Sequence, residues 1–382
     1  MKLAFVVSLW FPFGGMQRAM LRIAQACVAA GHQVDVYTGE WRGERPEGIG
    51  VYELDTRAAS NHASNDLLGS AFADAVKGMG YDCRVGFTKI PGLDVYYAAD
   101  PCYAARAAET KPFYYRWWTR YRSLLRQERA VFGRGKSTEL MLIAHQEKQK
   151  FIDFYGTEAA RFHLLPPGID RDRLLKGAHA QDRARLRADF GLDDNRRVLL
   201  CVGSRFRTKG VDRVIEAMAS LTLPLRSECH LLVVGDGKPA PLQRLAERLG
   251  VGAQVSFTGT REDVPAFYRA ADYLVHAARS ENTGTVLIEA MICGLPVLAT
   301  GNCGFAFHVQ AADAGLVLPE PFRQSELNKA LYDFLLSGQL AAWRENGPAY
   351  CAQTDLYSLI ECAAEVIIER AERSRRGRAQ GT

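Results

Sequence analysis

Apolar and polar positions follow a strand–helix–strand order over the first forty residues. The run Leu3–Leu9 is apolar over the length of a strand, and Phe11 to Gly15 predict a turn after it. Met16 to Ala30 then place apolar residues on one helical face, Gly31 is a natural helix stop, and Val34–Thr38 alternates like a second strand. A strand, a helix and another strand in this order predict a parallel sheet.

The alternation is weak between residues 40 and 100, where Arg84–Phe87 and Val95–Ala98 are the expected strands, and it returns after residue 195. There the expected strands, with helices between them, are Val198–Val202, Leu231–Val234, Val255–Thr258, Tyr273–His276, Pro296–Ala299 and Gly315–Leu318. The whole pattern predicts an α/β protein of two doubly wound, Rossmann-like domains. Ligands of such sheets bind outside the carboxyl ends of the strands, so two such domains facing each other would enclose a cleft.

The boundary between the two domains is expected at Pro166-Pro167-Gly168, because proline and glycine interrupt regular structure. We therefore expect an amino-terminal domain over residues 1–167 and a carboxy-terminal domain over residues 168–355. Residues 356–382 are expected to form a terminal helix and a basic tail, in which Ser374–Arg378 would be solvated.

Composition excludes several classes of protein. Of the 382 residues, 48% are hydrophobic and 24% charged, which argues against a disordered or fibrous chain. The nine cysteines show no Cys-x-x-Cys spacing, which favours a reducing compartment over a secreted disulfide framework. No apolar run approaches the ~20 residues of a membrane span, so we expect a cytoplasmic protein that is soluble or peripheral. No pair of histidines or cysteines has the spacing of metal ligands.

The net charge of +5 is unevenly distributed. Residues 111–136 hold eight Lys or Arg and one Glu, and on a helix Phe113, Trp117, Tyr121 and Leu124 would share one face. Aromatic and basic side chains combined in this way are typical of helices at an anionic membrane surface. A single-stranded nucleic-acid site and a partly buried helix with arginine stems over apolar surface are the alternatives.

Two glycine-containing loops are candidate anion sites. Gly14-Gly15 precedes a helix, whose free N–H groups could hold an anion, but the Gly-x-Gly-x-x-Gly fingerprint of dinucleotide binding is missing, which argues against an oxidoreductase. The loop from Gly203 to Gly210 follows a strand and carries Arg205 and Lys209. An arginine fork and a lysine point charge together suit a diphosphate.

A third loop carries two carboxylates at the start of a helix. Glu281 precedes the expected helix Val286–Cys293, and Glu289 lies within it, with Thr283 and Gly284 at the helix start. Free N–H groups at that end favour a phosphate, and carboxylates accept hydrogen bonds from sugar hydroxyls. This loop therefore predicts a site for a phosphorylated sugar.

The spacing Glu281 to Glu289 resembles the Glu-x7-Glu signature of family-4 retaining glycosyltransferases with the GT-B fold. Within that family the chain is most similar to the lipopolysaccharide core glucosyltransferase I subfamily. The stretches that carry this likeness are Phe11-Pro12-Phe13-Gly14-Gly15, Pro91-Gly92-Leu93-Asp94-Val95-Tyr96, Ala98-Ala99-Asp100, Gly135-Lys136-Ser137-Thr138 and Lys209-Gly210-Val211-Asp212-Arg213. The resemblance runs almost from end to end.

The resemblance implies a role for each candidate residue. Arg205 and Lys209 would neutralise the diphosphate of a UDP-sugar without a metal, and Asp100 would lie near the anomeric centre. The expected donor-site residues are Gly15, Arg173, Arg205, Lys209, Glu281, Asn282, Gly284, Thr285 and Glu289, with Glu281 on the sugar and Glu289 on the ribose. The acceptor would be a heptose of the lipid A–inner core, reached at the cytoplasmic face of the inner membrane.

Departures from the subfamily pattern leave the donor sugar open. Ala19 stands where an acidic residue is expected, Asn282-Thr283 where small residues are expected, and Tyr97 lies near Asp100. UDP-glucose is therefore the favoured donor and a UDP-N-acetylhexosamine, UDP-GlcNAc or UDP-GalNAc, the alternative. A competing class is a non-catalytic membrane or nucleic-acid binding protein built around residues 111–136, although no nucleic-acid partner is expected if the chain is an enzyme.

Overall fold

The structure is a computed structural model that describes residues 1–12, 14–170, 174 and 181–380. The chain divides into two compact units. Unit 1 comprises Met1–Gly168 together with Ser358–Thr382, and unit 2 comprises Ile169–Tyr357. The terminal segment after unit 2 therefore belongs with the first part of the chain.

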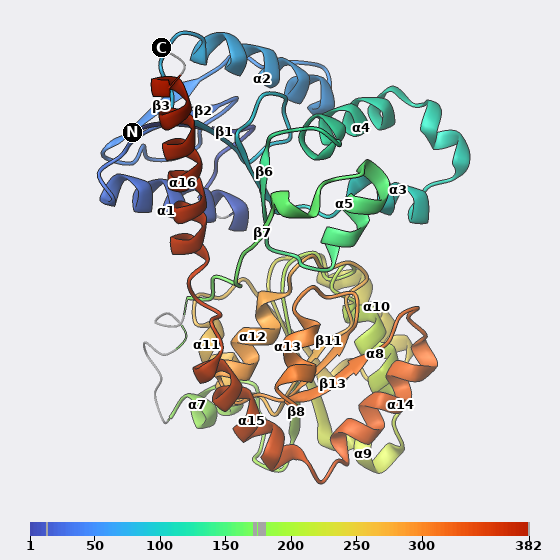
Figure 1. Cartoon of the computed structure of the whole chain (residues 1–382). Helices are drawn as coiled ribbons and strands as arrows, with labels where there is room; N and C mark the ends of the chain where they lie inside the picture. The colour runs from blue at the N-terminus through green and yellow to red at the C-terminus, as the bar shows by residue number, and fades with distance from the viewer. Residues whose placement is uncertain (13, 171–173, 175–180, 381–382) are drawn as a thin grey trace. The chain divides into compact units, whose positions relative to one another are not determined.

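Unit 1 is built on a seven-stranded sheet with the order β3-β2-β1-β4-β5-β6-β7 (Figure 1), in which all pairs are parallel. The strands are β1 (Lys2–Val7), β2 (Gln33–Thr38), β3 (Ile49–Glu53), β4 (Cys83–Gly86), β5 (Val95–Ala98), β6 (Glu139–Leu142) and β7 (Phe162–Leu164). The helices are α1 (Gly15–Ala29), α2 (Asn61–Val76), α3 (Tyr103–Thr110), η1 (Phe113–Trp117), α4 (Thr119–Phe132), α5 (Glu147–Tyr155), η2 (Ala159–Arg161) and α16 (Leu359–Gln380).

One face of this sheet is covered by α1 and α16, which contact each other and cross in Figure 1. Ile23 of α1 and Ile367 of α16 are fully buried in the same cluster as Leu3 and Phe5 of β1. Both helices bury apolar residues, so much of the stability of α16 comes from packing on the sheet rather than from helix propensity. The last helix of the chain is thus part of the core of unit 1.

Residues Ser374–Arg378 are mostly exposed, as expected, but they continue the helix α16 instead of forming a separate tail. Arg378 forms an ion pair with Asp82, just before β4, and Arg370 reaches Asp94, just before β5, at 3.1 Å. Acidic residues at the amino ends of β4 and β5 thus form ion pairs with basic side chains of α16. The partners are far apart in the sequence, so no local pattern could predict these pairs.

Unit 2 contains a six-stranded parallel sheet with the order β10-β9-β8-β11-β12-β13. The strands are β8 (Arg197–Val202), β9 (Cys229–Val234), β10 (Val255–Gly259), β11 (Tyr273–His276), β12 (Val297–Thr300) and β13 (Gly315–Leu318). The helices are α7 (Asp182–Asp189), α8 (Val211–Ala219), α9 (Leu223–Glu228), α10 (Pro239–Arg248), η3 (Gly252–Gln254), α11 (Val264–Ala270), α12 (Thr285–Ile292), α13 (Ala306–Ala311), α14 (Gln324–Leu335) and α15 (Leu340–Gln353).

Each sheet contains the point at which its strand order reverses, and this point positions the candidate sites. In unit 1 the reversal lies between β1 and β4, and in unit 2 it lies between β8 and β11. At such a point the loops after two neighbouring strands diverge to opposite faces of the sheet and leave a crevice for a ligand. The doubly wound α/β architecture expected from the sequence is confirmed in both units.

The basic segment, residues 111–136, is not the single helix that the spacing predicted. The 3₁₀ helix η1 ends at Trp117, Trp118 is extended (φ −73°, ψ 138°), and α4 begins at Thr119. The break allows the Tyr115 ring to pack on Tyr121, with centroids 5.7 Å apart. On one continuous helix these two residues would be about 120° apart around the axis, so aromatic packing overrides the helical pattern.

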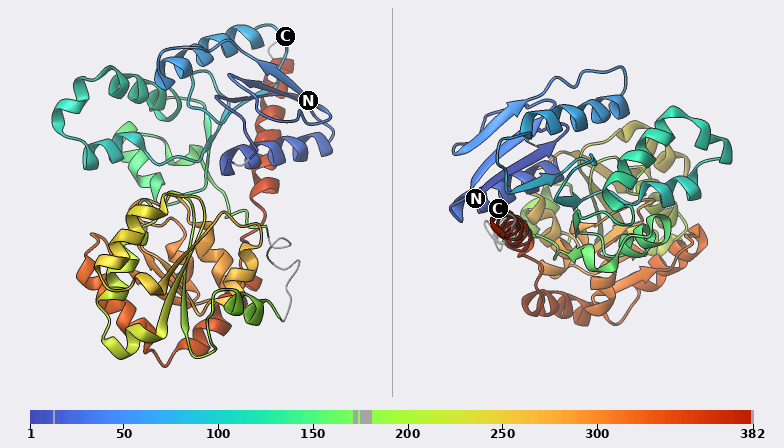
Figure 2. Two further views of the ribbon diagram at one scale, coloured as in Figure 1. Left: turned by 180° about the vertical axis from the view of Figure 1, so that it is seen from behind. Right: turned by 45° about the horizontal axis from the view of Figure 1, so that its top comes forward.

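Four aromatic side chains of this segment are exposed. The backbone that joins α3 to α4 lies at the outer edge of unit 1 in Figures 1 and 2. Phe113 and Trp117 are each 72% exposed, Trp118 57% and Tyr114 51%. The helix α4 instead buries another face, including Gln127, Glu128 and Val131, none of which belongs to the predicted face. No helix in the described part of the chain is both long and apolar enough to span a bilayer.

Candidate functional site

The loop between β8 and α8 brings Arg205 and Lys209 to the reversal point of unit 2. Gly203, Arg205 and Gly210 all have positive φ values, of 142°, 59° and 72°, which fold the loop tightly. The backbone N–H of Arg205 donates to the carbonyl of Asp236 at 2.9 Å and ties the loop to the end of β9. The side chain of Arg205 is exposed, whereas Lys209 is largely covered.

Lys209 forms an ion pair with Oε2 of Glu281, which follows β11. The same oxygen lies 3.3 Å from Nε2 of His276, the last residue of β11. The two loops that diverge at the reversal point are therefore joined by their charged side chains. The predicted residues Lys209 and Glu281, 72 positions apart in the chain, are direct neighbours.

The carboxyl group of Glu281 is largely buried, and burial by itself raises its pKa. The hydrogen bond from His276 and the charge of Lys209 act in the opposite direction and prevail, so the pKa falls from 4.5 to about 2. Glu281 is consequently ionised at neutral pH and accepts hydrogen bonds only. It can receive the hydroxyl hydrogens of a sugar.

Glu289 lies in the second turn of α12, and its Oε2 accepts a hydrogen bond from the hydroxyl of Tyr268 at 2.7 Å. Tyr268 belongs to α11 and is 1% exposed. A rigid, buried donor thus sets the orientation of this carboxylate. A carboxylate accepts hydrogen bonds from hydroxyl groups, which is the chemistry expected of Glu289.

The start of α12 has the form that the sequence predicted. Gly284 is the residue before the helix and has φ 86°, while Thr285 is the first helical residue and is exposed. A Cβ atom on Gly284 would lie 3.2 Å from Cγ of Glu281, so glycine lets the Glu281 side chain pack against the helix start. Asn282 is partly buried between these residues.

In unit 1, Asp100 is exposed and lines a pocket of about 470 Å³ at the carboxyl ends of β1, β4 and β5. Arg106 lines the same pocket, and within the described residues neither side chain forms an ion pair or a hydrogen bond. The third charged group, Lys89, is neutralised by the fully buried Glu128 at 2.6 Å. The other residues that line the pocket are Ser8, Met16, Gln17, Asn65, Phe87, Thr88, Tyr96, Ala99, Pro101, Tyr103, Leu124 and Gln127.

Gly15 is the first residue of α1, and a Cβ atom added to it would meet no atom within 4 Å. The backbone there is open, as the sequence analysis required for a close approach to a ligand. Arg173, the remaining predicted donor-site residue, lies outside the described residues. In the described part of the chain, no three His, Cys, Asp or Glu side chains gather as a metal site.

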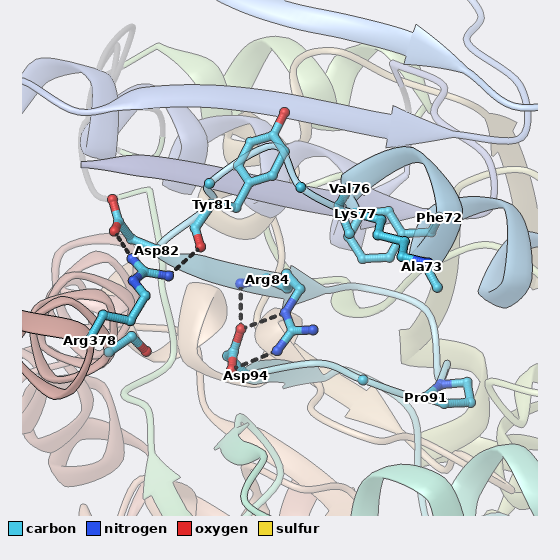
Figure 3. Close-up of a pocket in the computed structure, with 14 residues that line it drawn as sticks. Phe72, Ala73, Val76, Lys77, Tyr81, Asp82, Arg84, Pro91, Asp94 and Arg378 are labelled. Atoms are coloured by element: carbon cyan, nitrogen blue, oxygen red, sulfur yellow. Dashed lines mark hydrogen bonds and ion pairs between the residues drawn. The ribbon is translucent and has the colours of Figure 1, made fainter. Parts of the chain in front are cut away.

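A second pocket in unit 1, of about 430 Å³, lies at the opposite edge of the sheet (Figure 3). Its polar groups already satisfy one another: Arg84 pairs with Asp94 at 2.8 Å, and Arg378 pairs with Asp82. Both acids immediately precede strands, so this pocket lies at the amino ends of β4 and β5. Ligands of doubly wound sheets bind at the other end, and this pocket is not the candidate site.

Comparison with known proteins identifies the family of the chain. Residues 182–349 fit the family described as glycosyl transferases group 1. The chain is 44% identical over 368 residues to lipopolysaccharide glucosyltransferase WaaG from Escherichia coli (strain K12), covering 96% of this chain and 98% of the relative. The chain belongs to the WaaG family of glycosyltransferases.

Solved structures agree with this family membership. The crystal structure of WaaG, described as a glycosyltransferase involved in lipopolysaccharide biosynthesis, has a TM-score of 0.86 and covers 96% of this chain and 99% of its own. Anabaena Alr3699/HepE in complex with UDP and glucose is 20% identical with a TM-score of 0.72, covers 97% of this chain and 100% of its own, and shares the fold. The WaaG-family chain is therefore a hexosyltransferase with the GT-B fold. The competing hypothesis of a non-catalytic binding protein is rejected.

Two residues of this WaaG-family site were missed by the sequence analysis. The sequence indicates only that His276 is the last residue of a buried strand and that Tyr268 is a core aromatic of a helix. Each contacts a predicted carboxylate from a different element. A signal existed for His276, since it stands five residues before Glu281 at the carboxyl end of a strand, where sites form.

Proposed function

We propose that this enzyme transfers a hexose from a UDP-sugar, with UDP-glucose as the favoured donor, to a heptose of the lipopolysaccharide inner core. The configuration at the anomeric carbon is retained, and no metal takes part. The observation that carries the proposal is the pairing of Lys209 with Glu281 at the strand-order reversal of unit 2. The names of WaaG as a lipopolysaccharide glucosyltransferase and of the UDP and glucose complex of HepE support the substrate classes.

The donor diphosphate needs positive charge as the bond to the anomeric carbon breaks. The bonding electrons leave with the β-phosphate of UDP, and Arg205 and Lys209 stabilise the charge that develops there. The side chain of Arg205 is exposed at the mouth of the loop and can turn toward a phosphate. These two cations thus take the part that a divalent metal plays in other transferases.

The sugar and the ribose are held by the two carboxylates. Glu281, ionised and largely buried, accepts hydrogen bonds from donor-sugar hydroxyls, and Glu289 accepts them from the ribose. The backbone at Asn282 to Thr285 meets the phosphates and the sugar, with Gly284 allowing the approach. Gly15 and Arg173 complete the proposed donor site.

The acceptor hydroxyl approaches from the side of the departing diphosphate, which explains retention of configuration. Its oxygen forms the new bond to the anomeric carbon, and its proton passes to an oxygen of the leaving phosphate. Asp100 supplies electrostatic and orienting help from a pocket of unit 1 large enough for a sugar acceptor. The neighbouring Arg106 adds a positive charge to this pocket, which favours the binding of an anionic acceptor.

The enzyme would work at the cytoplasmic face of the inner membrane as a peripheral protein. The exposed aromatic side chains of residues 113–118 and the arginines beside them combine apolar surface with positive charge. Such a surface binds the boundary of an anionic bilayer. No nucleic-acid partner is proposed.

The alternative donor is a UDP-N-acetylhexosamine, since Asn282 carries an amide at the start of α12, where a small residue is expected from the resemblance. Release of UDP from a panel of UDP-sugars, with and without a heptosylated core acceptor, tests both donors. Acceptor-dependent release from UDP-glucose above all others supports the proposal, and preference for UDP-GlcNAc or UDP-GalNAc favours the alternative. Activity that is lost in chelator and restored by a divalent metal contradicts the metal-independent mechanism.

A further inference from the structure

We infer that His276 is a positioning residue, whose ring holds one oxygen of the Glu281 carboxylate so that the other oxygen faces the donor sugar. The inference rests on the proposed function, in which Glu281 binds the sugar. It adds a residue from the strand β11 to a site that is otherwise made of loops and one helix start.

The two carboxylate oxygens of Glu281 differ in their contacts. Nε2 of His276 lies 3.3 Å from Oε2, and Nζ of Lys209 contacts the same atom. Within the described part of the chain, Oε1 takes part in no hydrogen bond or ion pair. Because the carboxylate is ionised it can only accept, so Nε2 of His276 carries the proton and donates.

The backbone of Glu281 is already fixed, which leaves the side-chain torsions as the remaining freedom. The N–H of Gly304 donates to the carbonyl of Glu281 at 3.3 Å, and Glu281 pairs with Cys303 in an isolated parallel bridge. Gly284 allows Cγ of Glu281 close approach on one side. The direction of the carboxylate is then set by the hydrogen-bond donor on β11, which is His276.

Lys209 cannot hold this direction alone during the reaction. Its amine is flexible and is also the proposed partner of the departing diphosphate, so its contact with Glu281 weakens when donor binds. His276 has only two side-chain torsions, is 2% exposed, and sits on a strand paired on both sides by β8 and β12. A group on such a rigid element keeps its place while the lysine moves.

The test compares two amides of different reach. In His276→Gln the side-chain nitrogen extends to about the position of Nε2, whereas in His276→Asn it ends near Nδ1. We expect His276→Asn to lower kcat/KM for the UDP-sugar by about 100-fold, the cost of a misplaced contact, and His276→Gln to recover most of it. Affinity for UDP alone should stay within about twofold in both variants, because UDP lacks the sugar that Glu281 holds.

His230→Asn is the matched control, because it removes the hydrogen bond from the buried His230 to Ser256 at 2.9 Å in the same sheet. It should leave kcat/KM close to that of the unmodified enzyme. Equal loss of affinity for UDP and for UDP-sugar in His276→Asn would mean a structural role and overturn the inference, as would equal activity of the Asn and Gln variants. If the unmodified enzyme neither binds nor turns over any UDP-sugar, the proposed function is contradicted, and so is the inference that rests on it.

Discussion

Gly210 lies so close to Ala277 that a Cβ atom on Gly210 would come within 1.8 Å of the Ala277 carbonyl oxygen. This contact places the loop after β8 directly against the end of β11. Lys209, the preceding residue, thereby reaches Glu281. The close approach of two backbones, rather than any side-chain packing, is what brings the two charged residues together.

Gly210→Ala should therefore destabilise the protein and displace Lys209. The positive φ of 72° alone costs an alanine about 1–2 kcal/mol, and the clash with Ala277 forces the loop to shift. We expect a lower midpoint of urea unfolding and weaker binding of UDP-sugar. Gly250→Ala is the control, because Gly250 has φ 71° and nothing within 4 Å of an added Cβ; it should lose stability but not affinity. Equal affinities for all three proteins would contradict the role assigned to this contact.

Removing the loop cations should slow donor turnover. Arg205→Ala and Lys209→Ala each take away a charge that stabilises the departing diphosphate, and we expect kcat to fall about 100-fold or more in each. Initial rates of UDP release measure this. Arg207→Ala removes an equal charge from the same loop at an exposed position and should leave the rate nearly unchanged. A double Arg205→Ala, Lys209→Ala variant with normal turnover would refute the diphosphate assignment.

The ionised state of Glu281 has a consequence for stability at low pH. Since its folded pKa of about 2 lies below its usual value of 4.5, its charge stabilises the fold fully above pH 4.5, and this contribution is lost as the pH falls toward 2. The difference in unfolding free energy between the unmodified protein and Glu281→Gln should therefore shrink between pH 5 and the lowest pH at which the fold survives. Urea titrations of both proteins at each pH give this difference, and one that stays constant would contradict the low pKa.

Asp100→Asn should separate the acceptor side from the donor side. Asp100 lines a pocket of unit 1, so we expect slower transfer to the heptosylated acceptor with unchanged affinity for UDP. Calorimetry with UDP and a transfer assay give the two readouts. Asp74→Asn, at an exposed position on α2, is the control for the change in charge. Normal transfer by Asp100→Asn would remove this residue from the site.

The exposed aromatic side chains should govern binding to vesicles. Replacing Phe113 and Trp117, each 72% exposed, with serine should weaken co-sedimentation with vesicles that contain phosphatidylglycerol. Leu223→Ser is the control, because Leu223 is 71% exposed on unit 2. Replacing Arg116 and Arg120 with glutamine should reduce the dependence on anionic lipid, and Arg126 is better left in place because it pairs with Asp66 at 2.6 Å. Binding that is unaffected by both sets of changes would contradict a membrane role for this surface.

The sequence predicted the elements whose patterns are local. The strands β5, β11 and β13 have the expected bounds, and the start of α12 at Gly284 follows the expected form. Lys209 and Glu281 could be placed near each other because both follow strands of one parallel sheet. By contrast, β7 has only three residues and no period that a short window could detect.

Contacts between distant segments could not be predicted in the same way. The orientation of Glu281 depends on a side chain that turns back to His276, and that of Glu289 depends on a hydroxyl from another helix. The break at Trp118 depends on the packing of Tyr115 against Tyr121. In each case the deciding interaction joins groups whose spacing in the chain carries no signal of their contact.

The place of α16 in unit 1 affects the order in which the chain can fold during synthesis. The sheet of unit 1 is translated first, but Ile367 and its neighbours in α16, which cover one face of that sheet, are translated after the whole of unit 2. Domains usually fold as they emerge from the ribosome, the amino-terminal one first. Here unit 2 is the uninterrupted segment and can complete its core earlier, whereas the part of the unit 1 sheet that α16 covers stays exposed until that helix has been synthesised.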